Sequence, residues 1–197
     1  MTEPSAYVRR LPIGEPIPFS ADGIPMWETF PFEGELRVRE LEPPVLPEPP
    51  RNGEHGPDGC EACVRPDGDH LWTDEHWRLQ GIRAALPAVV VLVPRGHHDL
   101  LDLPAERAAE LGGMLQRVER AVRTVGGIGR VHVNKYGDGG AHLHLFLFAR
   151  PEGMLQLRGS NLALWDDVLP PQSEEAWAGS ARLIAAAMAK DGGTAHV

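Results

Sequence analysis

The chain has 197 residues, with 19 Lys and Arg against 28 Asp and Glu, and a formal net charge of −9 at pH 7. This length suits one domain with appendages, because single cores commonly hold about 100–200 residues. The acidic balance argues against a nucleic-acid partner, since a broad cationic surface is needed to bind a phosphate backbone. A membrane partner is not expected either, because the longest apolar run, AALPAVVVLVP, is shorter than the roughly 20 residues of a bilayer crossing. The start of the chain lacks the apolar core of a signal peptide, so we expect a cytoplasmic protein.

Residues 1–57 predict an extended N-terminal arm. Prolines are frequent there, and LEPPVLPEPPRNGEHGPDG in residues 41–59 is typical of extended, partly polyproline II backbone. Leu36, Val38 and Leu41 alternate imperfectly, which indicates one short strand. We expect the arm to wrap the following domain rather than to fold alone.

The two cysteines of the chain, Cys60 and Cys63, form a CxxC pair. In a cytoplasmic protein this spacing indicates a metal half-site or a redox pair rather than a structural disulfide. A redox pair of the thioredoxin kind follows a strand and opens a helix, whereas turn residues flank this pair on both sides. The pattern therefore favours metal binding.

From residue 70 onward, the hydrophobic patterns predict an α+β domain. HLWTDEHWRLQ (70–80) and the β-branched LPAVVVLVPRG (86–96) indicate strands, and the second strand is expected in the centre of a sheet. Between Pro104 and Gly126, apolar residues recur at spacings of three and four, which predicts an amphipathic helix. The apolar face of this helix comprises Ala108, Leu111, Leu115, Val118 and Val122.

Two further strands, GRVHVNKYG and AHLHLFLFAR, are expected to pair in antiparallel fashion around the loop GDGG. A helix followed by paired strands implies a sheet with the helix on one face. The tail predicts a loop anchored by Trp165 and then a helix that begins at Ser173 as its N-cap. The apolar stripe of that helix comprises Trp177, Leu183, Ile184 and Met188.

The strand AHLHLFLFAR carries two histidines. Alternate side chains of a strand share a face, so His142, His144, Phe146 and Phe148 are expected to point the same way. The two imidazoles would lie roughly 6–7 Å apart. With the CxxC pair, the chain offers two thiolates and several imidazoles, the donors of a tetrahedral Zn²⁺ site.

The residues alone leave the metal-ligand set open. Cys60 and Cys63 would supply one edge of the site, and His142 with one of His97 or His98 the other. In a second arrangement, His144 is the fourth ligand. In a third, the CxxC is a reduced turn and the histidines are ordinary core or surface residues.

The order of these motifs resembles the histidine triad (HIT) superfamily. The matching features are the CxxC, a strand ending in PxxH (Pro94 to His97), the helix entrance DLLDLPAERAAEL, a strand bearing Asn134, and HLHLFLF. They span residues 58–150. The resemblance implies a HIT-like antiparallel sheet with a helix packed on one face, followed by a C-terminal extension with a helix in residues 151–197. It also implies a homodimer.

The resemblance further implies roles for individual residues. His144 matches the middle, nucleophilic histidine of the family motif. The ligands of the structural zinc in zinc-containing branches match Cys60, Cys63, His97 and His142. The expected substrate contacts are Asn134, Gly139 and Gly140.

Two features depart from the family pattern. Family members have a third histidine, and the related galactose-1-phosphate uridylyltransferases and diadenosine tetraphosphate phosphorylases have Gln, where this chain has Phe146. The loop GDGG replaces the usual Gly-Gln-Ser/Thr phosphate-binding segment, and Asp138 would repel a phosphate unless it faces away. The glycines could still bring backbone N–H groups close to a phosphate, although a simple hairpin turn explains them equally well.

These features lead to the hypothesis of a nucleotide phosphohydrolase or nucleotidyltransferase that acts on an NMP-X substrate through a covalent histidine-nucleotidyl intermediate. The alternative is a catalytically weak or inactive HIT-like nucleotide-binding protein with structural zinc. The alternative arises because Phe146 cannot donate a hydrogen bond, and one lost donor to developing charge costs roughly 10²–10³ in rate. In both cases the partner is a small-molecule nucleotide.

Overall fold

The computed structural model describes residues 8–18 and 27–197. The chain divides into two compact units, Met1–Pro50 and Arg51–Val197. In the first unit, the described residues form two single-turn 3₁₀ helices, Val8–Arg10 and Trp27–Thr29. The short strand predicted at residues 36–41 is not found there, because no neighbouring strand pairs with it among the described residues. Only an isolated parallel bridge joins Ile13 to Leu41.

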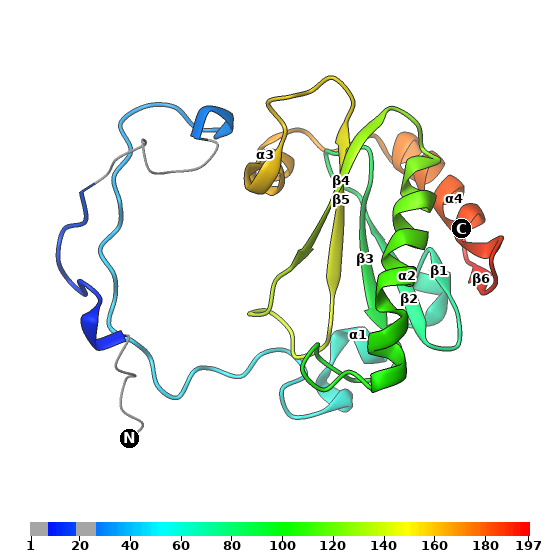
Figure 1. The fold of residues 1–197 in the computed structure, drawn as a ribbon, viewed down its shortest axis with the longest axis horizontal. Coiled ribbons are helices and arrows are strands. Elements are labelled where there is room, and N and C mark those ends of the chain that lie inside the picture. The colour runs from blue at the N-terminus through cyan, green and yellow to red at the C-terminus, as the bar shows by residue number, and fades with distance from the viewer. Residues whose placement is uncertain (1–7, 19–26) are drawn as a thin grey trace. The chain divides into compact units, whose positions relative to one another are not determined.

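The second unit is built on a six-stranded antiparallel sheet (Figure 1). The strands are β1 (Trp72–Thr73), β2 (Trp77–Ile82), β3 (Val89–Pro94), β4 (Ile128–Lys135), β5 (Leu145–Pro151) and β6 (Thr194–Ala195). Their order across the sheet is β4-β5-β3-β2-β1-β6. The central position predicted for the β-branched strand is confirmed, since β3 lies between β5 and β2 and is buried along its whole length.

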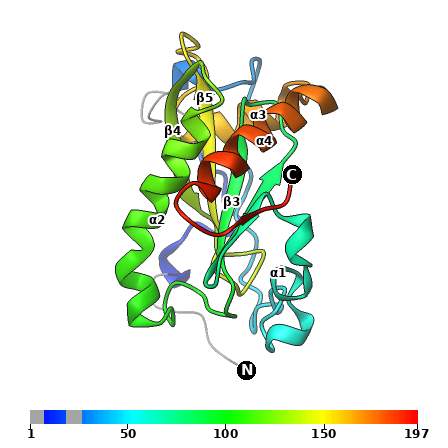
Figure 2. The same cartoon turned by 90° about the vertical axis from the view of Figure 1, so that its right-hand side faces the viewer.

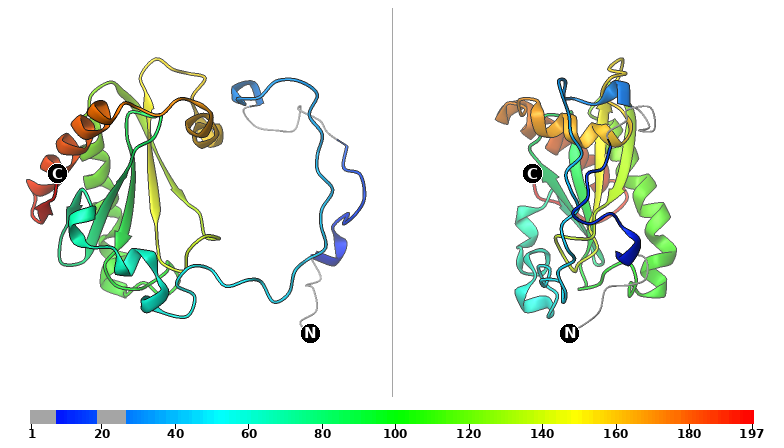
Figure 3. Two further views of the ribbon diagram at one scale, coloured as in Figure 1. Left: turned by 180° about the vertical axis from the view of Figure 1, so that it is seen from behind. Right: turned by 90° about the vertical axis from the view of Figure 1, so that its left-hand side faces the viewer.

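Helices cover both faces of this sheet. They are α1 (Glu61–Val64), α2 (Ala105–Arg123), α3 (Leu162–Val168) and α4 (Glu174–Ala189). The long helices α2 and α4 lie side by side on one face (Figure 2), whereas α3 packs near β5 on the opposite face (Figure 3). The predicted α+β class, with a sheet and packed helices, is confirmed.

The alternation of side chains in β5 divides the core between the two faces. Leu145 and Leu147 join the large apolar cluster under α2 and α4. Phe148 joins a second cluster on the other face, which includes Leu162 of α3. The rings of Phe146 and Phe148 stack at 5.8 Å, so these two side chains share a face as the sequence pattern predicts. Much of that second face stays free of the long helices and carries the site described below.

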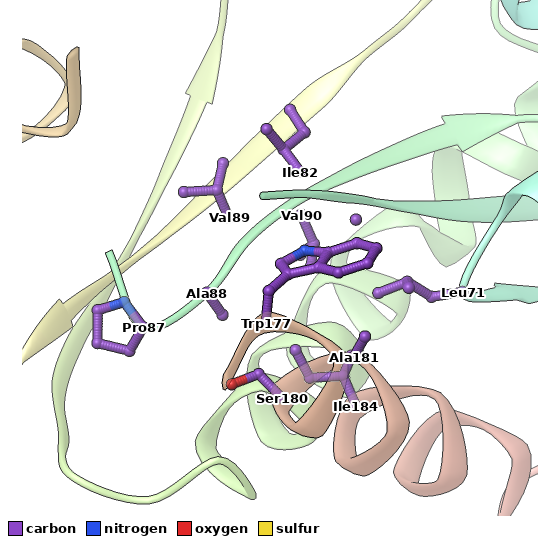
Figure 4. A pocket seen from close by; sticks show the side chains of 11 residues that line it. Leu71, Ile82, Pro87, Ala88, Val89, Val90, Trp177, Ser180, Ala181 and Ile184 are labelled. Carbon is purple, nitrogen blue, oxygen red and sulfur yellow. The ribbon is translucent and has the colours of Figure 1, made fainter. Parts of the chain in front are cut away.

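Helix α4 contacts the sheet through its predicted apolar stripe, except that Leu183 of that stripe is exposed. Trp177, Ala181 and Ile184 point toward the strands in Figure 4. The space left between them is about 10 Å³, room for about one water molecule. This contact is therefore a packed interface rather than a ligand site. The predicted N-cap is also observed, since the Ser173 hydroxyl accepts the amide of Ala176 at 3.2 Å.

Three local predictions were wrong. Residues 70–80 form a hairpin rather than one strand, because the Asp74 carboxylate accepts the amides of His76 and Trp77 at 2.8 and 2.6 Å and so builds a turn. Strand β5 begins at Leu145 rather than at residue 141, since Leu145 is the first residue of this segment that pairs with Leu92 of β3 and with Lys135 of β4. The segment around Trp165, expected as a loop, contains helix α3.

In the part of the chain that the structure describes, no helix combines the length and the apolar character needed to cross a membrane.

Candidate active site and metal centre

Helix α1 and its flanking turn position the two cysteines. Cys60 is the N-cap residue of α1, and its carbonyl accepts the amides of Cys63 and Val64 at 3.0 and 3.1 Å. The Asn52 side chain clamps this turn from outside, because its Oδ1 accepts the Glu61 amide at 2.9 Å and its Nδ2 donates to the Gly59 carbonyl at 3.1 Å. The CxxC backbone is thereby fixed.

Four potential metal ligands come together from three parts of the chain. The donor atoms of Cys60, Cys63, His97 and His142 all lie within 4.8 Å of one another. His142 Nδ1 is 3.5 Å from Cys60 Sγ and 3.4 Å from Cys63 Sγ, and His97 Nδ1 is 3.3 Å from Cys63 Sγ. Donor atoms around a tetrahedral Zn²⁺ are about 3.3–3.8 Å apart, given the usual Zn–N and Zn–S bond lengths. These three distances match the spacing around a tetrahedral ion.

The second nitrogen of each imidazole in the cluster is tied to the backbone. His142 Nε2 donates to the Pro94 carbonyl at 2.8 Å, and His97 Nε2 donates to the Gly53 carbonyl at 3.1 Å. A carbonyl oxygen can only accept, so both Nε2 atoms carry the proton and both Nδ1 atoms present a lone pair to the sulfurs. Metal-binding histidines are oriented by this kind of second contact.

Burial governs the protonation of the cluster. Desolvation, assisted by the neighbouring Cys60, raises the pKa of Cys63 to about 11. Desolvation also lowers the pKa of His142, which keeps its ring neutral. Without a cation the Cys63 side chain is therefore a thiol at pH 7, and an ion bound there would displace its proton.

Gly53 is a residue of this centre that the sequence reasoning missed. Its φ of +76° is a conformation that side chains disfavour, and a Cβ there would lie 2.8 Å from Cys60 Cβ and 3.1 Å from His97 Cε1. Only glycine fits between the two ligands. The Asn-Gly pair in RNGEHG, a common turn signal, could have indicated it.

His98, the alternative ligand to His97, lies outside the cluster. Its Nδ1 is 3.7 Å from Asp102 Oδ2, and its backbone carbonyl accepts the Leu143 amide at 2.7 Å. The side chain of His98 lines a separate hollow beside Arg95 and Glu106.

The His144 side chain is oriented by the residue that precedes it by two. Its Nδ1 is 2.6 Å from the His142 carbonyl oxygen. Because that oxygen only accepts, Nδ1 carries the proton and Nε2 is left with a free lone pair. His144 is half-buried and does not belong to the metal cluster. The orientation of the His144 ring therefore depends on the position of the His142 backbone.

A hollow of about 300 Å³ opens beside His144 on the sheet face opposite α2 and α4. Ligand pockets commonly begin at about this size. Its floor is formed by apolar side chains of the strands, namely Ile82, Val91, Val93 and Phe146. The polar lining comprises Asn52, Glu61, Arg65, Gln80, Gly139 and Gly140 together with Cys60, His142 and His144. An apolar floor with a polar rim can take a flat ring carrying charged groups.

The glycine loop is hydrogen-bonded to the segment that clamps the CxxC turn. The Asn52 backbone N–H donates to the Gly139 carbonyl at 3.1 Å, and the Asn52 backbone carbonyl accepts the Ala141 N–H at 2.9 Å. Arg51 donates to the Gly137 carbonyl at 2.9 Å and to Asp99 at 3.2 Å. A Cβ on Gly140 would come within 3.8 Å of the His144 ring, so the loop backbone lies directly against the histidine.

Asn134 lies one strand away from the hollow. Its Cα pairs with that of Phe146 across β4 and β5, which places both side chains on one face of the sheet. It is not among the described residues that line the hollow.

Solved structures with a similar chain trace were found, whereas no protein-family model and no curated protein matches the sequence. A histidine triad protein from Marinobacter aquaeolei VT8 has a TM-score of 0.49 and 20% identity, over 61% of this chain and 88% of the other. A zinc-bound histidine triad family protein from Mycobacterium smegmatis has a TM-score of 0.44 and 23% identity, over 68% and 96%. A uridylyltransferase has a TM-score of 0.45 and 22% identity, over 66% and 44%. These structures are of the histidine triad kind that the motif order resembles, together with a uridylyltransferase.

Proposed function

We propose that this protein is a nucleotide phosphohydrolase or nucleotidyltransferase, which binds an NMP-X substrate in the hollow and attacks it with His144. The observation that carries this proposal is the 2.6 Å contact from His144 Nδ1 to the His142 carbonyl. It leaves the Nε2 lone pair as a nucleophile beside a hollow large enough for a nucleotide.

The reaction divides into two displacements. First, the His144 Nε2 lone pair forms a bond to the α-phosphorus, and the bond from phosphorus to X breaks with its electron pair leaving on X. The ring then carries a positive charge, which the His142 carbonyl stabilises through the Nδ1–H it accepts. In the second displacement, water or another acceptor attacks the phosphorus, loses a proton, and returns the electron pair to Nε2.

Zn²⁺ is the ion we propose for the cluster, held by Cys60, Cys63, His97 and His142. Two sulfur and two nitrogen donors match its preference, and four protein ligands leave no open position, which is typical of a structural site. Bound there, Zn²⁺ would fix His142 and hence the carbonyl that orients His144.

The substrate contacts are also proposals. The amides of Gly139 and Gly140 donate no hydrogen bond to another described residue, so they are available to a phosphate at the rim of the hollow. Asn134 is proposed to contact the substrate beyond Phe146, on the same face of the sheet. A homodimer and a cytoplasmic location stay predictions.

The second candidate is a nucleotide-binding protein with little or no turnover. The observation that favours it is the Phe146 ring, 5.8 Å from the His144 ring, which offers no hydrogen bond to a reacting phosphate.

Covalent labelling tests the proposal. Zinc-loaded protein is incubated with α-³²P-labelled nucleoside diphosphate compounds of several bases and quenched within seconds. We expect an acid-labile label that is absent from His144→Ala and retained in His98→Ala, a matched control outside the cluster. Saturable nucleotide binding without a label would favour the second candidate, and neither binding nor label would contradict both.

A further inference from the structure

We infer that the substrates of this site carry a leaving group that departs as a stable anion without receiving a proton, such as the phosphate or pyrophosphate end of an acid anhydride. This inference rests on the proposed function, because it concerns the bond that breaks when His144 attacks. Alcohol and amine leaving groups would react poorly.

Among the described residues, the side chains next to the nucleophile provide no proton donor. Phe146 follows His144 by two residues on the same face, and its ring meets the His144 ring edge to face at 5.8 Å and 84°. The Phe146 ring is held in place, since it stacks on Phe148 at 5.8 Å and contacts Tyr136 at 5.7 Å. Further along the floor lie Val91 and Val93, which are apolar.

The N–H groups of the two imidazoles near the substrate already donate hydrogen bonds to backbone carbonyls. His142 donates from Nε2 to the Pro94 carbonyl and turns Nδ1 toward the two sulfurs. His144 donates from Nδ1 to the His142 carbonyl, and its Nε2 is the attacking atom. Neither imidazole can therefore protonate X during the first displacement.

The remaining charged groups at the rim are Glu61 and Arg65, at the two ends of the α1 turn. Arg65 carries a permanent positive charge and five N–H donors, so it stabilises an anionic leaving group without transferring a proton. Glu61 is exposed, and a carboxylate there would disfavour the anion unless water screens it. Glu61 is thus the residue that must be tested as a proton donor.

The chemistry of X decides how much a missing proton donor matters. When X is a phosphate, the departing oxygen belongs to a group whose second pKa is about 6, so the anion is stable at pH 7. An alkoxide is a far stronger base, comparable to hydroxide. Positioned acids contribute typically 10²–10⁴ in rate where a proton is needed. The missing proton donor therefore slows only substrates with a strongly basic leaving group, such as an alkoxide.

The test is a leaving-group series on the full-length, zinc-loaded protein. One nucleoside 5′-phosphoryl group is joined to pyrophosphate, p-nitrophenol, phenol, methanol and morpholine, and kcat/KM is measured with each. We expect a steep decline with leaving-group basicity, by at least about 10³ from the anhydride to the methyl ester and the morpholidate. Equal rates for the anhydride and the morpholidate would overturn the inference.

Substitutions at Phe146 locate the cause. Phe146→His is expected to accelerate the phenyl ester and the morpholidate by about 10²-fold or more, while the anhydride changes little. Phe146→Leu, which removes the ring but adds no donor, should not accelerate them. The inference is wrong if Phe146→His folds, as judged by circular dichroism and zinc content, and kcat/KM declines with leaving-group basicity as steeply as in the wild type. Should the variant not fold, the wild-type series decides.

Two further variants test for a hidden acid. Glu61→Gln and Tyr136→Phe are expected to leave the wild-type dependence on leaving group unchanged, and a steeper dependence in either would overturn the inference. The result is separable from the proposed function. A His144 label with every substrate at equal rates would refute only the leaving-group inference, whereas no label with any substrate would refute both.

Discussion

His97 and His142 each donate a hydrogen bond from Nε2 to a backbone carbonyl and direct Nδ1 toward a cysteine sulfur. These contacts distinguish them from His98, whose side chain faces Asp102 instead. The pattern predicts that the first two histidines bind zinc and that the third does not.

His97→Ala should therefore lose zinc. Because even residues that only orient a ligand change metal affinity by about 10–100-fold, removal of a ligand is expected to reduce it by more than 100-fold. Titration against a chromogenic chelator measures this. His98→Ala, one residue away, should retain wild-type affinity, and an equal loss in both variants would contradict the assignment of His97.

Gly53 provides a second prediction for a single residue. Gly53→Ala places a methyl group against Cys60 and His97 in a backbone conformation with φ of +76°. We expect a loss of about 1–3 kcal/mol in the free energy of unfolding and a 10–100-fold weaker zinc affinity. Gly59→Ala is the matched control, since a Cβ there meets no atom within 4 Å. Equal behaviour of the two variants in chelator titration and urea unfolding would count against the role of Gly53.

Single residues were predictable from the sequence where their chemistry is distinctive. Cysteine and histidine stand out by type and spacing, so the sequence indicated Cys60, Cys63 and His142 as candidates, whereas His97 rather than His98 followed only from the family resemblance. The roles of Asn52 and Gly53 do not follow from residue type in this way, although their Asn-Gly pair is a turn signal. Asn52 acts by capping a turn that is distant in sequence, and Gly53 acts through the absence of a side chain.

At the scale of elements, long periodic segments were predictable and short ones were not. Helix α2 and strands β3 and β4 follow from sustained apolar patterns. The seven-residue helix α3 has no such pattern, and it is held by a tertiary contact in which Asp166 accepts the amides of Ala85 and Leu86 at 2.9 Å. The β1–β2 turn likewise depends on a side chain, the Asp74 carboxylate.

Asp67 connects several elements near α1. Its carboxylate accepts from Arg95 at 2.9 and 3.0 Å and from the buried Arg78 at 3.1 Å, and Arg78 also donates to the Ala62 carbonyl of α1. The hydrogen bonds and charge of Arg95, followed by those of Arg78, lower the pKa of Asp67. This carboxylate stabilises the fold above the ordinary Asp pKa of about 3.9, and the stabilisation is lost as the pH falls through the lower value of the folded state.

Asp67→Asn is expected to cost about 1–2 kcal/mol in the free energy of unfolding at pH 7, chiefly because the buried Arg78 loses its anion. Urea unfolding at pH 7 and pH 3 measures the effect, which should shrink at the lower pH. Asp69→Asn, at an exposed position two residues away, should change little. A loss that is the same at both pH values would argue against the charge as its cause.

At the scale of the whole molecule, buried histidines predict how stability depends on pH. Burial lowers the pKa of His70, and burial with the nearby Arg150 lowers the pKa of His132. Below the ordinary His pKa of about 6.5, these histidines bind protons in the unfolded chain but not in the folded chain. The free energy of unfolding therefore falls as the pH falls.

His132→Phe should weaken this dependence. The buried His132 Nε2 has no hydrogen-bond partner among the described residues, so an apolar ring of similar shape is expected to be neutral or stabilising at pH 7. Its advantage over the wild type should grow as the pH falls to 5. Thermal unfolding between pH 5 and 8 measures this, with the exposed His55→Ala as control. Parallel curves for His132→Phe and the wild type would contradict the prediction.

In the second unit as a whole, we propose that a metal-held His142 presents the ring of His144 to a nucleotide. A crystal structure of the zinc-loaded protein with a non-hydrolysable nucleotide measures this directly. We expect Zn²⁺ on Cys60, Cys63, His97 and His142, with His144 Nε2 about 3–3.5 Å from the α-phosphorus. An ion ligated by His144, or a nucleotide bound away from that ring, would contradict it.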